Sequence, residues 1–518
     1  MTLEERLSRL EERLAHVESE RDQYQQLYEL TTLELQRLRR NLFGQKAEVV
    51  DPRQVQLAFE KLGAKERDPA LEALLASKNS AKSRKGKSKS KPAGRKPIPE
   101  DLPVERIVLE PPGDTQGLKH IRDELTETIE WRSASLVRVI VVRPCYADPK
   151  ASEHGVVAAE APEKPIARCK AGVGLLASVI TQKHADHIPL HRQEKIFARH
   201  GVSISRSTMS GWLQGCAALL VRITDAMHAD ALARSSWIGV DATGVLVQAP
   251  KRCKRGHFWV MVSSCGHVLF RYSERHSGED AHALLEGFNG YVQADASSVY
   301  HELYRKEDVI EAGCWAHCRR NFFEAILSDE ERALQAIGWI KSLYRIEREL
   351  TESKLDASQR LVERKARAGP VVQGFFDWVK QEKINALPRS PLGKALQYAD
   401  NQRQALERFL EDGRLRLDNN LSELELRRQV VGRKNWLFCG NDEAAQRNTV
   451  FVSLVASCER AGVEPWAYLR DVLSLLPRWN ARRVIELAPI HWLETLKREE
   501  TQALLDADIF RSVSAAQA

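Results

Sequence analysis

The first 45 residues carry apolar side chains at the seven-residue spacing of a coiled coil. The apolar seam consists of Leu3, Leu7, Leu10, Leu14, Val17, Tyr24, Tyr28, Leu35, Leu38 and Leu42. Only Arg21 and Thr31 interrupt it, and Glu and Arg crowd its flanks. This pattern favours helices that wrap around each other. We therefore expect residues 1–45 to form a leucine zipper that makes the chain at least a dimer. A helix packed back on its own chain is the alternative.

Residues 46–97 contain a helical piece followed by a segment in which basic residues alternate with Ser, Gly and Pro. The basic residues are Lys78, Lys82, Arg84, Lys85, Lys87, Lys89, Lys91, Arg95 and Lys96. No hydrophobic core can form from such a composition, so we expect a disordered linker. Its charge suits either a solvated tail or a segment that binds phosphates without sequence preference.

Two β-branched runs, at 104–109 and 135–142, predict a small β-rich domain over residues 98–170. Helical patterns follow at 172–182, 191–199 and 205–213, with a turn at 200–202 that contains a glycine.

The last two helices and their turn match a helix-turn-helix, in which the second helix enters the major groove of DNA. We therefore predict a DNA-binding region at 171–228, although generic helical hairpins share this pattern. The expected DNA contacts are Arg192, Arg206, Ser207, Thr208, Ser210 and Trp212.

From residue 234 the pattern changes to strands. We expect strands at 236–241, resuming at 244–248, and at 258–263, 268–272, 290–295 and 309–313, with a helix at 279–288. Three strands, a helix, a fourth strand and further helices is the order of an RNase H-like α/β fold. We place this catalytic domain at residues 229–470.

The segment 326–416 is polar and helical, with no strand signal. It predicts an all-α insertion in the catalytic domain, with helices at 329–352, 357–368, 371–384 and 392–410. Residues 471–518 form a helical tail. The expected fold class is thus multidomain, with a coiled coil, a β-rich domain and a helix-turn-helix ahead of an α/β core.

The amino-acid composition limits the kinds of binding partner that we expect for this chain. The 518 residues carry a net charge of +7, and the uneven distribution of that charge favours nucleic acid. Nine scattered cysteines favour a reducing compartment over a disulfide scaffold. Because no apolar run is long enough to cross a bilayer, we expect no membrane partner and a cytoplasmic location.

Three acids stand out against this background. Asp241 and Asp295 end predicted strands, and Glu423 lies just over one turn inside a helix that Asp418 or Asn419 can cap. In an RNase H-like sheet the first and fourth strands are neighbours, so the two aspartates meet and the helix brings the glutamate. Three carboxylates on rigid elements can hold two Mg²⁺ or Mn²⁺ ions about 4 Å apart for phosphoryl transfer. Taken singly, each aspartate is an ordinary turn residue.

Polar residues around these acids are candidates for DNA contact or support of the acids. They are Arg319, Arg320, Asn419, Asn420, Arg427, Arg433, Lys434, Asn435 and Trp436. Arginine suits phosphate geometry and an aromatic ring can stack on a splayed base. The alternative is ion pairing with Glu311, Glu423 or Glu425, and a buried tryptophan.

Cys314, His317 and Cys318 share one face of a helix. They could bind zinc, support the acids or contact DNA, or simply pack. A fourth zinc ligand is not visible.

The sequence resembles the TnpC-type DDE transposases of the bacterial insertion sequence sixty-six family over nearly its whole length. The resemblance rests on Leu42-Phe43-Gly44, Gly94-Arg95-Lys96-Pro97 and the motifs at 183–193, 314–320, 418–423, 432–438 and 465–471. It implies an RNase H-like core and Mg²⁺-dependent strand cleavage and transfer by Asp241, Asp295 and Glu423. It also implies terminal inverted repeats and target DNA as substrates, small accessory proteins as partners, and association with the bacterial nucleoid.

Two positions depart from the family pattern. Glu110-Pro111-Pro112-Gly113 stands where the family carries a zinc-binding CxxC pair, and Cys145 is single, so zinc is not expected. Asp241-Ala242-Thr243 replaces Asp-Glu-Thr, although the missing glutamate is not expected to be a metal ligand. Two other functions compete: a catalytically inactive, transposase-derived DNA-binding dimer, and a two-carboxylate hydrolase of a non-nucleic substrate.

Overall fold

The computed structural model describes residues 145–147, 156–158, 163–167, 169–250, 252–305 and 308–511, together with Leu136. The chain divides into two units, Ala73–Val141 and the remainder, and the elements below all belong to the remainder. The predicted coiled coil, the basic linker and most of the β-rich domain lie outside the described residues. From that last domain the structure describes the short antiparallel pair β1 (Cys145–Ala147) and β2 (Val156–Ala158), together with Leu136 and residues 163–167 and 169–170.

A five-stranded mixed sheet lies at the centre, in the order β5-β4-β3-β6-β7. The long strands β3 (Trp237–Val247) and β4 (Lys254–Ser263) form an antiparallel hairpin, and β5 (Val268–Ser273) continues it. The short strands β6 (Gly290–Gln293) and β7 (Val309–Ala312) run parallel to β3. The strands predicted between residues 236 and 313 are therefore all present, but β3 is continuous where a break was predicted after Asp241. Its pairing with β4 carries it through to Val247.

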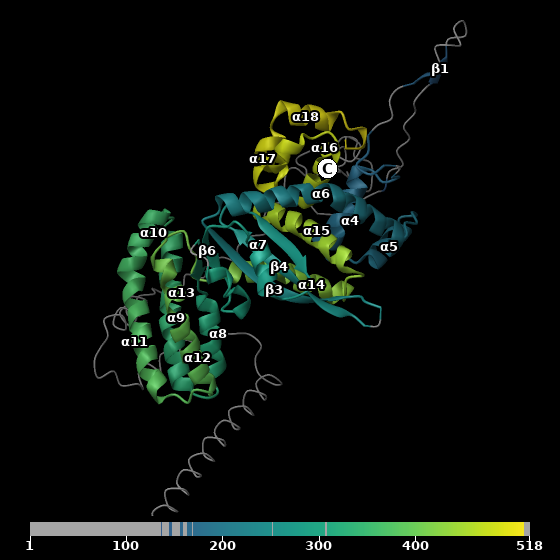
Figure 1. Cartoon of the computed structure of the whole chain (residues 1–518). Helices are drawn as coiled ribbons and strands as arrows, with labels where there is room; N and C mark the ends of the chain where they lie inside the picture. Colours follow the sequence, from purple (N-terminus) through teal and green to yellow (C-terminus); the bar gives the residue numbers. More distant parts are fainter. Residues whose placement is uncertain are drawn as a thin grey trace, which may run out of the picture. The chain divides into compact units, whose positions relative to one another are not determined.

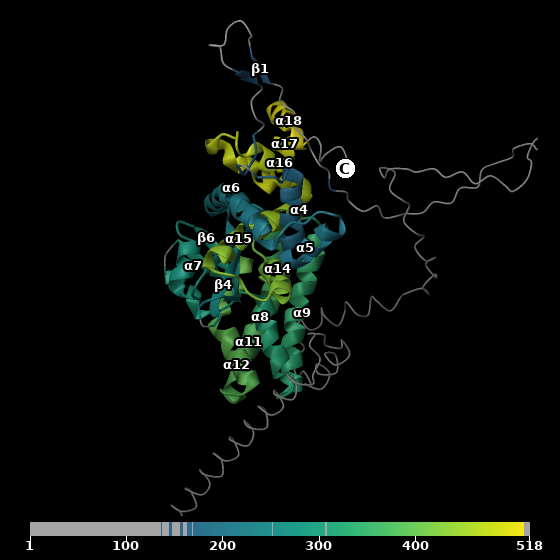
Figure 2. The same ribbon diagram turned by 90° about the vertical axis from the view of Figure 1, so that its right-hand side faces the viewer.

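Side-chain alternation along β4 divides the core between the two faces of the sheet. Val260 and Val262 pack against α14 (Asn420–Trp436) and α15 (Asp442–Arg460). Trp259 and Met261 point the other way, into the larger core that includes residues of α6 (Arg206–Arg234). Figures 1 and 2 show α14 and α15 running beside the sheet. In this α/β/α layering the start of α14 lies against Gly239 and Val240, near the beginning of β3.

Among the described residues, two helices precede α6, namely α4 (Val173–His184) and α5 (Leu190–Arg199). The predicted helices are at the right places, but α6 does not end near residue 213. It continues to Arg234, because a buried stripe that includes Leu220, Ile223 and Met227 packs into the core along its whole length. The domain boundary predicted at 228 therefore falls inside a helix. Between the sheet strands lie α7 (Gly278–Leu284), shorter than predicted, η3 (Ser298–Tyr300) and η4 (Leu303–Arg305).

Residues 315–410 form a helical group with its own aromatic core. Its elements are α8 (Trp315–Ala325), α9 (Glu330–Glu352), α10 (Ala357–Glu363), the π-turn η5 (Arg364–Ala368), α11 (Gly369–Asn385), α12 (Pro391–Asn401), α13 (Arg403–Glu407) and η6 (Arg408–Leu410). The single helix predicted at 392–410 is thus broken into three pieces.

The fully buried Arg364 ties this helical group to the segment that leads into α14. Its guanidinium pairs with Glu347 and donates to the carbonyls of Phe409, Asp412 and Leu415 at 3.1, 3.1 and 2.8 Å. Five donors in a planar fork allow one arginine to satisfy all these acceptors. The approach of the chain to residue 418 is therefore held rigidly.

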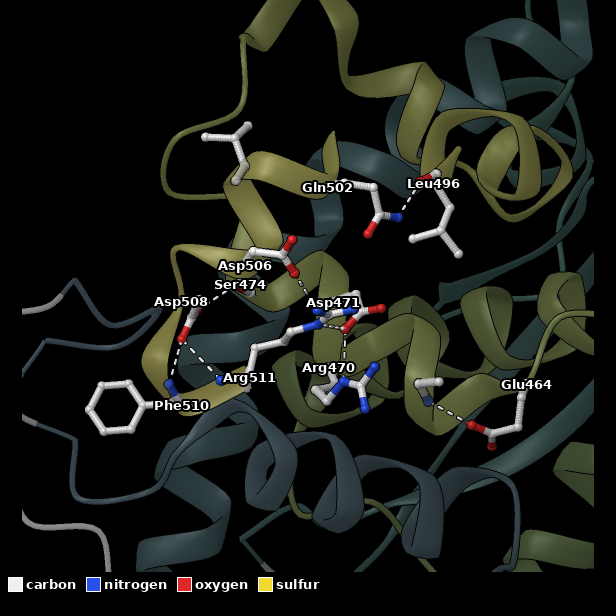
Figure 3. Close-up of polar contacts among 12 residues, drawn as sticks. Glu464, Arg470, Asp471, Ser474, Leu496, Gln502, Asp506, Asp508, Phe510 and Arg511 are labelled. Atoms are coloured by element: carbon white, nitrogen blue, oxygen red, sulfur yellow. Dashed lines mark hydrogen bonds and ion pairs between the residues drawn. The ribbon is translucent and has the colours of Figure 1, made fainter. Parts of the chain in front are cut away.

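The C-terminal helices are α16 (Pro465–Leu475), η7 (Ala481–Leu487), α17 (Pro489–Leu496) and α18 (Glu499–Asp506). Figure 3 shows the buried Asp471 accepting from Arg470 at 2.7 Å and from Arg511 at 3.2 Å, so the end of the chain is bonded to α16. Among the described helices, none combines the length and apolar character needed to cross a membrane.

Candidate active site

The two aspartates lie side by side because of the register of two parallel strands. Gly239 of β3 pairs with Gln293 of β6, the last residue of that strand. Asp241 and Asp295 each follow two residues after this pair. Asp241 is therefore inside a strand and Asp295 is beyond one, whereas both were predicted at strand ends. Strand β6 ends at Gln293, two residues before Asp295. The two acids therefore lie just beyond the paired part of β3 and β6, at an open edge of the sheet.

Close packing at Gly239 brings the third acid to the same place. A Cβ atom on Gly239 would lie 2.6 Å from Ser422 Oγ and 2.7 Å from Asn419 Oδ1, at the start of α14. Successive side chains on a strand alternate between faces, so Asp241 lies on the same face as this contact. Asn419 Nδ2 also donates to the carbonyl of Val240 at 2.8 Å. Glu423, in the first turn of α14, is thereby directed toward the aspartates.

Electrostatics couples the three carboxylates. The pKa of Asp241 is raised to about 7, mainly by burial and also by the negative charges of Asp295 and Glu423, against the Ala242 N–H and Arg320. The Ala242 N–H donates to Asp241 Oδ1 at 2.7 Å. A carboxylate held among other carboxylates and away from water is costly to ionise, and a cation at this point would relieve that cost.

Asp241→Asn is expected to stabilise the metal-free protein at pH 8. The folded pKa of Asp241 lies above the ordinary aspartate value of 3.8, so between about pH 4 and 7 the folded state binds more protons than the unfolded state. The free energy of unfolding therefore falls as pH rises through this window, and it stays lower above it. At about 1.4 kcal/mol per pKa unit, the Asn variant gains roughly 1–4 kcal/mol at pH 8.

Thermal denaturation in EDTA at pH 5 and pH 8 measures this gain, which should shrink toward the lower pH. Asp225→Asn is the matched control, because Asp225 is an exposed acid paired with Arg271. Equal melting temperatures for Asp241→Asn and the wild type at pH 8 would contradict the coupling.

Glu423 faces α8 rather than the next turn of its own helix. His317 Nε2 lies 3.5 Å from Glu423 Oε1, and Arg320 donates to Glu423 Oε2 at 3.4 Å. Glu423 is therefore paired with these two residues of α8. Arg427, one turn later in α14, was an alternative partner for Glu423, and it is exposed. Within the described residues, Glu423 Oε1 is buried and accepts no hydrogen bond. His317 and Arg320 thus both lie beside Glu423.

The two cysteines of α8 have different surroundings from His317. Cys318 is fully buried in the aromatic core of the helical group, and Cys314 Sγ accepts from the Asn419 N–H at 3.2 Å. Burial raises the pKa of the Cys314 thiol to about 11, so it stays protonated near neutral pH. The cysteines pack and fix the start of α14. Arg319, between them and Arg320, is half-buried.

The turn before α14 is held by Asp418 instead of by a capping side chain of Asn419. Asp418 is buried, and its carboxylate accepts from Tyr344 Oη at 2.7 Å and from the Asn420 N–H at 3.1 Å. Asn419 occupies the N-cap position, but its side chain is used by Val240 and makes no cap bond. Asn420 is exposed and donates its amide to Asp418. Of the two predicted caps, Asp418 is the one that bonds a free N–H of the helix.

The basic end of α14 contacts β3 from the same side. Arg433 donates to Thr243 Oγ1 at 2.9 Å and to the carbonyl of Gly244. Lys434 is exposed, and Asn435 is half-buried with only a long contact to the Val431 carbonyl at 3.5 Å. Trp436 packs against the small cluster around Phe258 and Cys439. Arg433 therefore has a structural partner that the sequence did not indicate.

The residues predicted to contact DNA at the helix pair are mostly exposed. Arg192 on α5 and Arg206, Ser207, Thr208 and Ser210 at the start of α6 are exposed. Ser205 caps α6 by accepting from the Thr208 N–H at 3.2 Å, and Gly201 in the turn has φ +80°. Trp212 is half-buried and packs against the main core, which favours a structural role for it.

The donors at the acid cluster suit a hard divalent cation. Asp241, Asp295 and Glu423 offer oxygen ligands alone, and Glu423 Oε1 is a buried acceptor without a hydrogen bond from the described residues. The three carboxylates are more widely spread than ligands of a single ion, since they do not all approach within 4.8 Å of one another.

Three positions that matter here were missed by the sequence interpretation. Gly239 permits the contact between β3 and α14, Tyr344 holds Asp418, and Ser422 fills the space above Gly239. Only Gly239 carries a usable signal, because a glycine inside a strand marks close approach of another backbone or helix.

Comparison with known proteins agrees with the motifs. A family model described as Transposase IS66 family matches residues 168–447, one described as Transposase C of IS166 homeodomain matches 31–107, and one described as IS66 C-terminal element matches 453–490. The chain is also similar to three proteins of Sinorhizobium fredii (strain NBRC 101917 / NGR234). Uncharacterized protein y4hP is 28% identical over 89% of this chain and 88% of its own length. The corresponding values are 29%, 91% and 90% for y4qI, and 28%, 77% and 80% for y4jD. Since the first model spans more than half of the sequence, this chain belongs to the IS66 transposase family.

Proposed function

We propose that this protein is a DDE transposase with an RNase H-like core, which cuts and joins DNA at the ends of an insertion sequence. In this proposal Asp241, Asp295 and Glu423 hold two Mg²⁺ or Mn²⁺ ions. The observation that carries it is the shared register of Asp241 and Asp295 beyond the Gly239–Gln293 pair, with Glu423 brought over the same face by α14. The strand order, with β3 between its antiparallel and parallel neighbours, supports the RNase H-like assignment.

Bound divalent ions would supply an activated water or 3′-hydroxyl and stabilise the leaving oxygen at phosphorus. The chain's own residues position this chemistry. Asp241 and Asp295 present oxygens from adjacent parallel strands, and Glu423 presents one from a helix start. In the free protein Arg320 pairs with Glu423 at 3.4 Å, and His317 Nε2 lies 3.5 Å from Glu423 Oε1.

We further propose that α5 and the start of α6 bind the terminal inverted repeats as a helix-turn-helix, with the N-terminal segment holding copies of the chain together. The matched model over residues 31–107 carries the word homeodomain in its description, which supports DNA binding by that segment too. Target DNA and small accessory proteins of the same element complete the proposed partners.

Arg206→Ala is expected to weaken binding to inverted-repeat DNA about three- to tenfold. Arg206 is exposed at the first position of α6 and its ion pair with Glu194 is solvent-accessible, so it is free to exchange that acid for a phosphate. Losing one phosphate contact should lower the slope of log K against log salt by about one.

Fluorescence anisotropy across a salt series measures both quantities for Arg206→Ala. Arg305→Ala serves as the control, since Arg305 is an equally exposed arginine paired with Glu302. If Arg206→Ala bound with the wild-type slope, α6 would not be placed on the DNA backbone.

The proposed activity is tested with the full chain and labelled duplexes that carry the DNA flanking its coding sequence. Mg²⁺ or Mn²⁺ should produce a nick that exposes a 3′-hydroxyl, and Ca²⁺ or EDTA should produce none. Binding of these duplexes without cleavage in any metal would overturn the enzyme and favour a DNA-binding protein derived from a transposase. Cleavage that persists in EDTA would overturn the two-ion site.

A further inference from the structure

A second group of metal-ligating side chains lies at the β4–β5 turn, at the end of the sheet where β3 begins. Asp230 comes from α6, and Cys265 and His267 come from the turn. One ligand atom from each lies within 4.8 Å of the others, and no other such group occurs among the described residues. Ser264 donates to the carbonyl of Trp237, four residues before Asp241, so the group is roughly 13 Å along the strand from the acid cluster.

His267 is fully buried and is satisfied on one side only. Its Nε2 lies 2.9 Å from Asp230 Oδ2, while Nδ1 is buried and makes no hydrogen bond with the described residues. Imidazole is the commonest metal ligand among side chains, and His267 presents its Nε2 atom toward Asp230.

Cys265 is half-buried, and two serine hydroxyls lie against its sulfur. Ser235 Oγ donates to its Sγ at 3.4 Å, and Ser263 Oγ lies 3.3 Å away. Ser263 also accepts from the His267 N–H at 2.9 Å, so one hydroxyl holds both potential ligands. Outer hydrogen bonds of this kind orient metal ligands and are a normal part of a metal site.

The turn that carries Cys265 and His267 is tight and pressed against α17. Gly266, between them, has φ +106°, and a Cβ at that position would lie 3.3 Å from Ile490 Cγ2. A side chain there would be strained by the left-handed backbone, so the two ligands are held at a fixed separation. His491 follows Ile490 on α17, where a further imidazole is available at the same junction.

We propose that Asp230, Cys265 and His267 bind a structural Zn²⁺ ion that joins the end of α6 to the β4–β5 turn. A thiolate, an imidazole and a carboxylate together favour zinc over Mg²⁺, because sulfur and nitrogen are softer ligands than oxygen. His491 of α17 or a water molecule supplies the fourth ligand. Binding transfers the thiol proton of Cys265 to solvent as the Zn–S bond forms.

The simpler arrangement is an ion-pair network without metal. Arg234 donates to both oxygens of Asp230 at 3.3 and 3.0 Å, and it is the cation nearest in sequence to that acid. When zinc binds, Arg234 and the ion share the carboxylate of Asp230. The several lone pairs of a carboxylate permit this sharing. Cys265 distinguishes the two arrangements, since it has no part in the ion pairs.

The test uses the full-length protein, purified without chelator and dialysed, with zinc measured by elemental mass spectrometry. We expect about one zinc per chain. Replacement by Co²⁺ should give a thiolate-to-cobalt charge-transfer band in the near ultraviolet. Cys265→Ala should abolish that band and weaken zinc by more than the roughly 10- to 100-fold that loss of an outer hydrogen bond costs. His267→Gln is a second ligand variant.

Cys253→Ala is the matched control, because Cys253 is an exposed cysteine beside the same hairpin, and it should keep the zinc and the band. Asp241→Asn should keep them too, which separates this site from the acid cluster. His491→Ala reports whether the fourth ligand is protein or water. The proposal would be overturned if the purified protein held no zinc and Cys265→Ala changed neither the zinc affinity nor the melting temperature. Loss of zinc in Asp241→Asn would also overturn it.

Discussion

Glu423→Gln should reduce the rate of metal-dependent DNA cleavage at least about a thousandfold, which corresponds to about 4 kcal/mol of transition-state stabilisation. The substitution keeps the size of the side chain but removes the charge that, in the proposed site, binds a divalent ion. Glu423 lies in the first turn of α14 over the aspartates, and its Oε1 is a buried acceptor with no hydrogen bond from the described residues. DNA binding should be unaffected, because the exposed residues of α5 and α6 are untouched.

Single-turnover cleavage and DNA affinity must be measured on the same preparation to separate chemistry from binding. Asp225→Asn changes charge equally at an exposed site outside the acid cluster, and it should cleave at the wild-type rate. Raising the Mn²⁺ concentration should rescue Glu423→Gln in part, since the weakened site still has two carboxylates. A variant that cleaves as fast as the wild type would exclude Glu423 from metal binding.

Gly239→Ala should reduce cleavage at least about a hundredfold although no reacting group is altered. The added methyl would lie 2.6 Å from Ser422 Oγ and 2.7 Å from Asn419 Oδ1, closer than carbon and oxygen can approach. Asn419 is held by its bond to the Val240 carbonyl and Ser422 is buried, so the start of α14 must move away from β3. A displacement of about 1 Å at a catalytic group costs about 100-fold in rate. Overpacking of this kind also costs about 1–3 kcal/mol of stability.

The double variant Gly239→Ala/Ser422→Ala distinguishes displacement from general damage. Ser422 Oγ makes no hydrogen bond with the described residues, so its removal frees space at little cost and should restore part of the activity. Gly369→Ala is the control, because a Cβ atom at Gly369 would meet no surrounding atom of the described residues within 4 Å. If Gly239→Ala retained full activity, the contact between β3 and α14 would not position Glu423.

The elements of the catalytic region could be predicted because local patterns dictate them. Alternating β-branched residues predict β3, β4 and β5, and the polar helical stretch after residue 326 predicts the helices of the insertion. Where a boundary was wrong, a distant partner decided it. β3 continues past Asp241 because β4 pairs with it, and α6 continues past residue 213 because its apolar stripe finds a core to bury.

The candidate acids could be named from the sequence, but their convergence could not be derived from it. Asp241, Asp295 and Glu423 stand out as acids at the right kinds of elements, and the motif from Asp418 onward marks the family. Their convergence depends on the strand register that pairs Gly239 with Gln293. It also depends on the close approach of the start of α14 to Gly239, which has no side chain. Strand register and helix packing are set by the summed burial of many residues, so no single motif encodes them.

The sequence by itself determined the family, the element types and the three acids, because these depend on residue identity and short-range spacing. The tertiary structure decided which groups meet. It brings Tyr344 to Asp418, Arg320 to Glu423 and Arg433 to Thr243, none of which are near each other in the chain. It likewise brings Asp230, Cys265 and His267 together, although no CxxC spacing in the sequence indicates a metal site there. Such groups meet only because the sheet and its covering helices bury their apolar faces together, which places distant polar residues at shared edges.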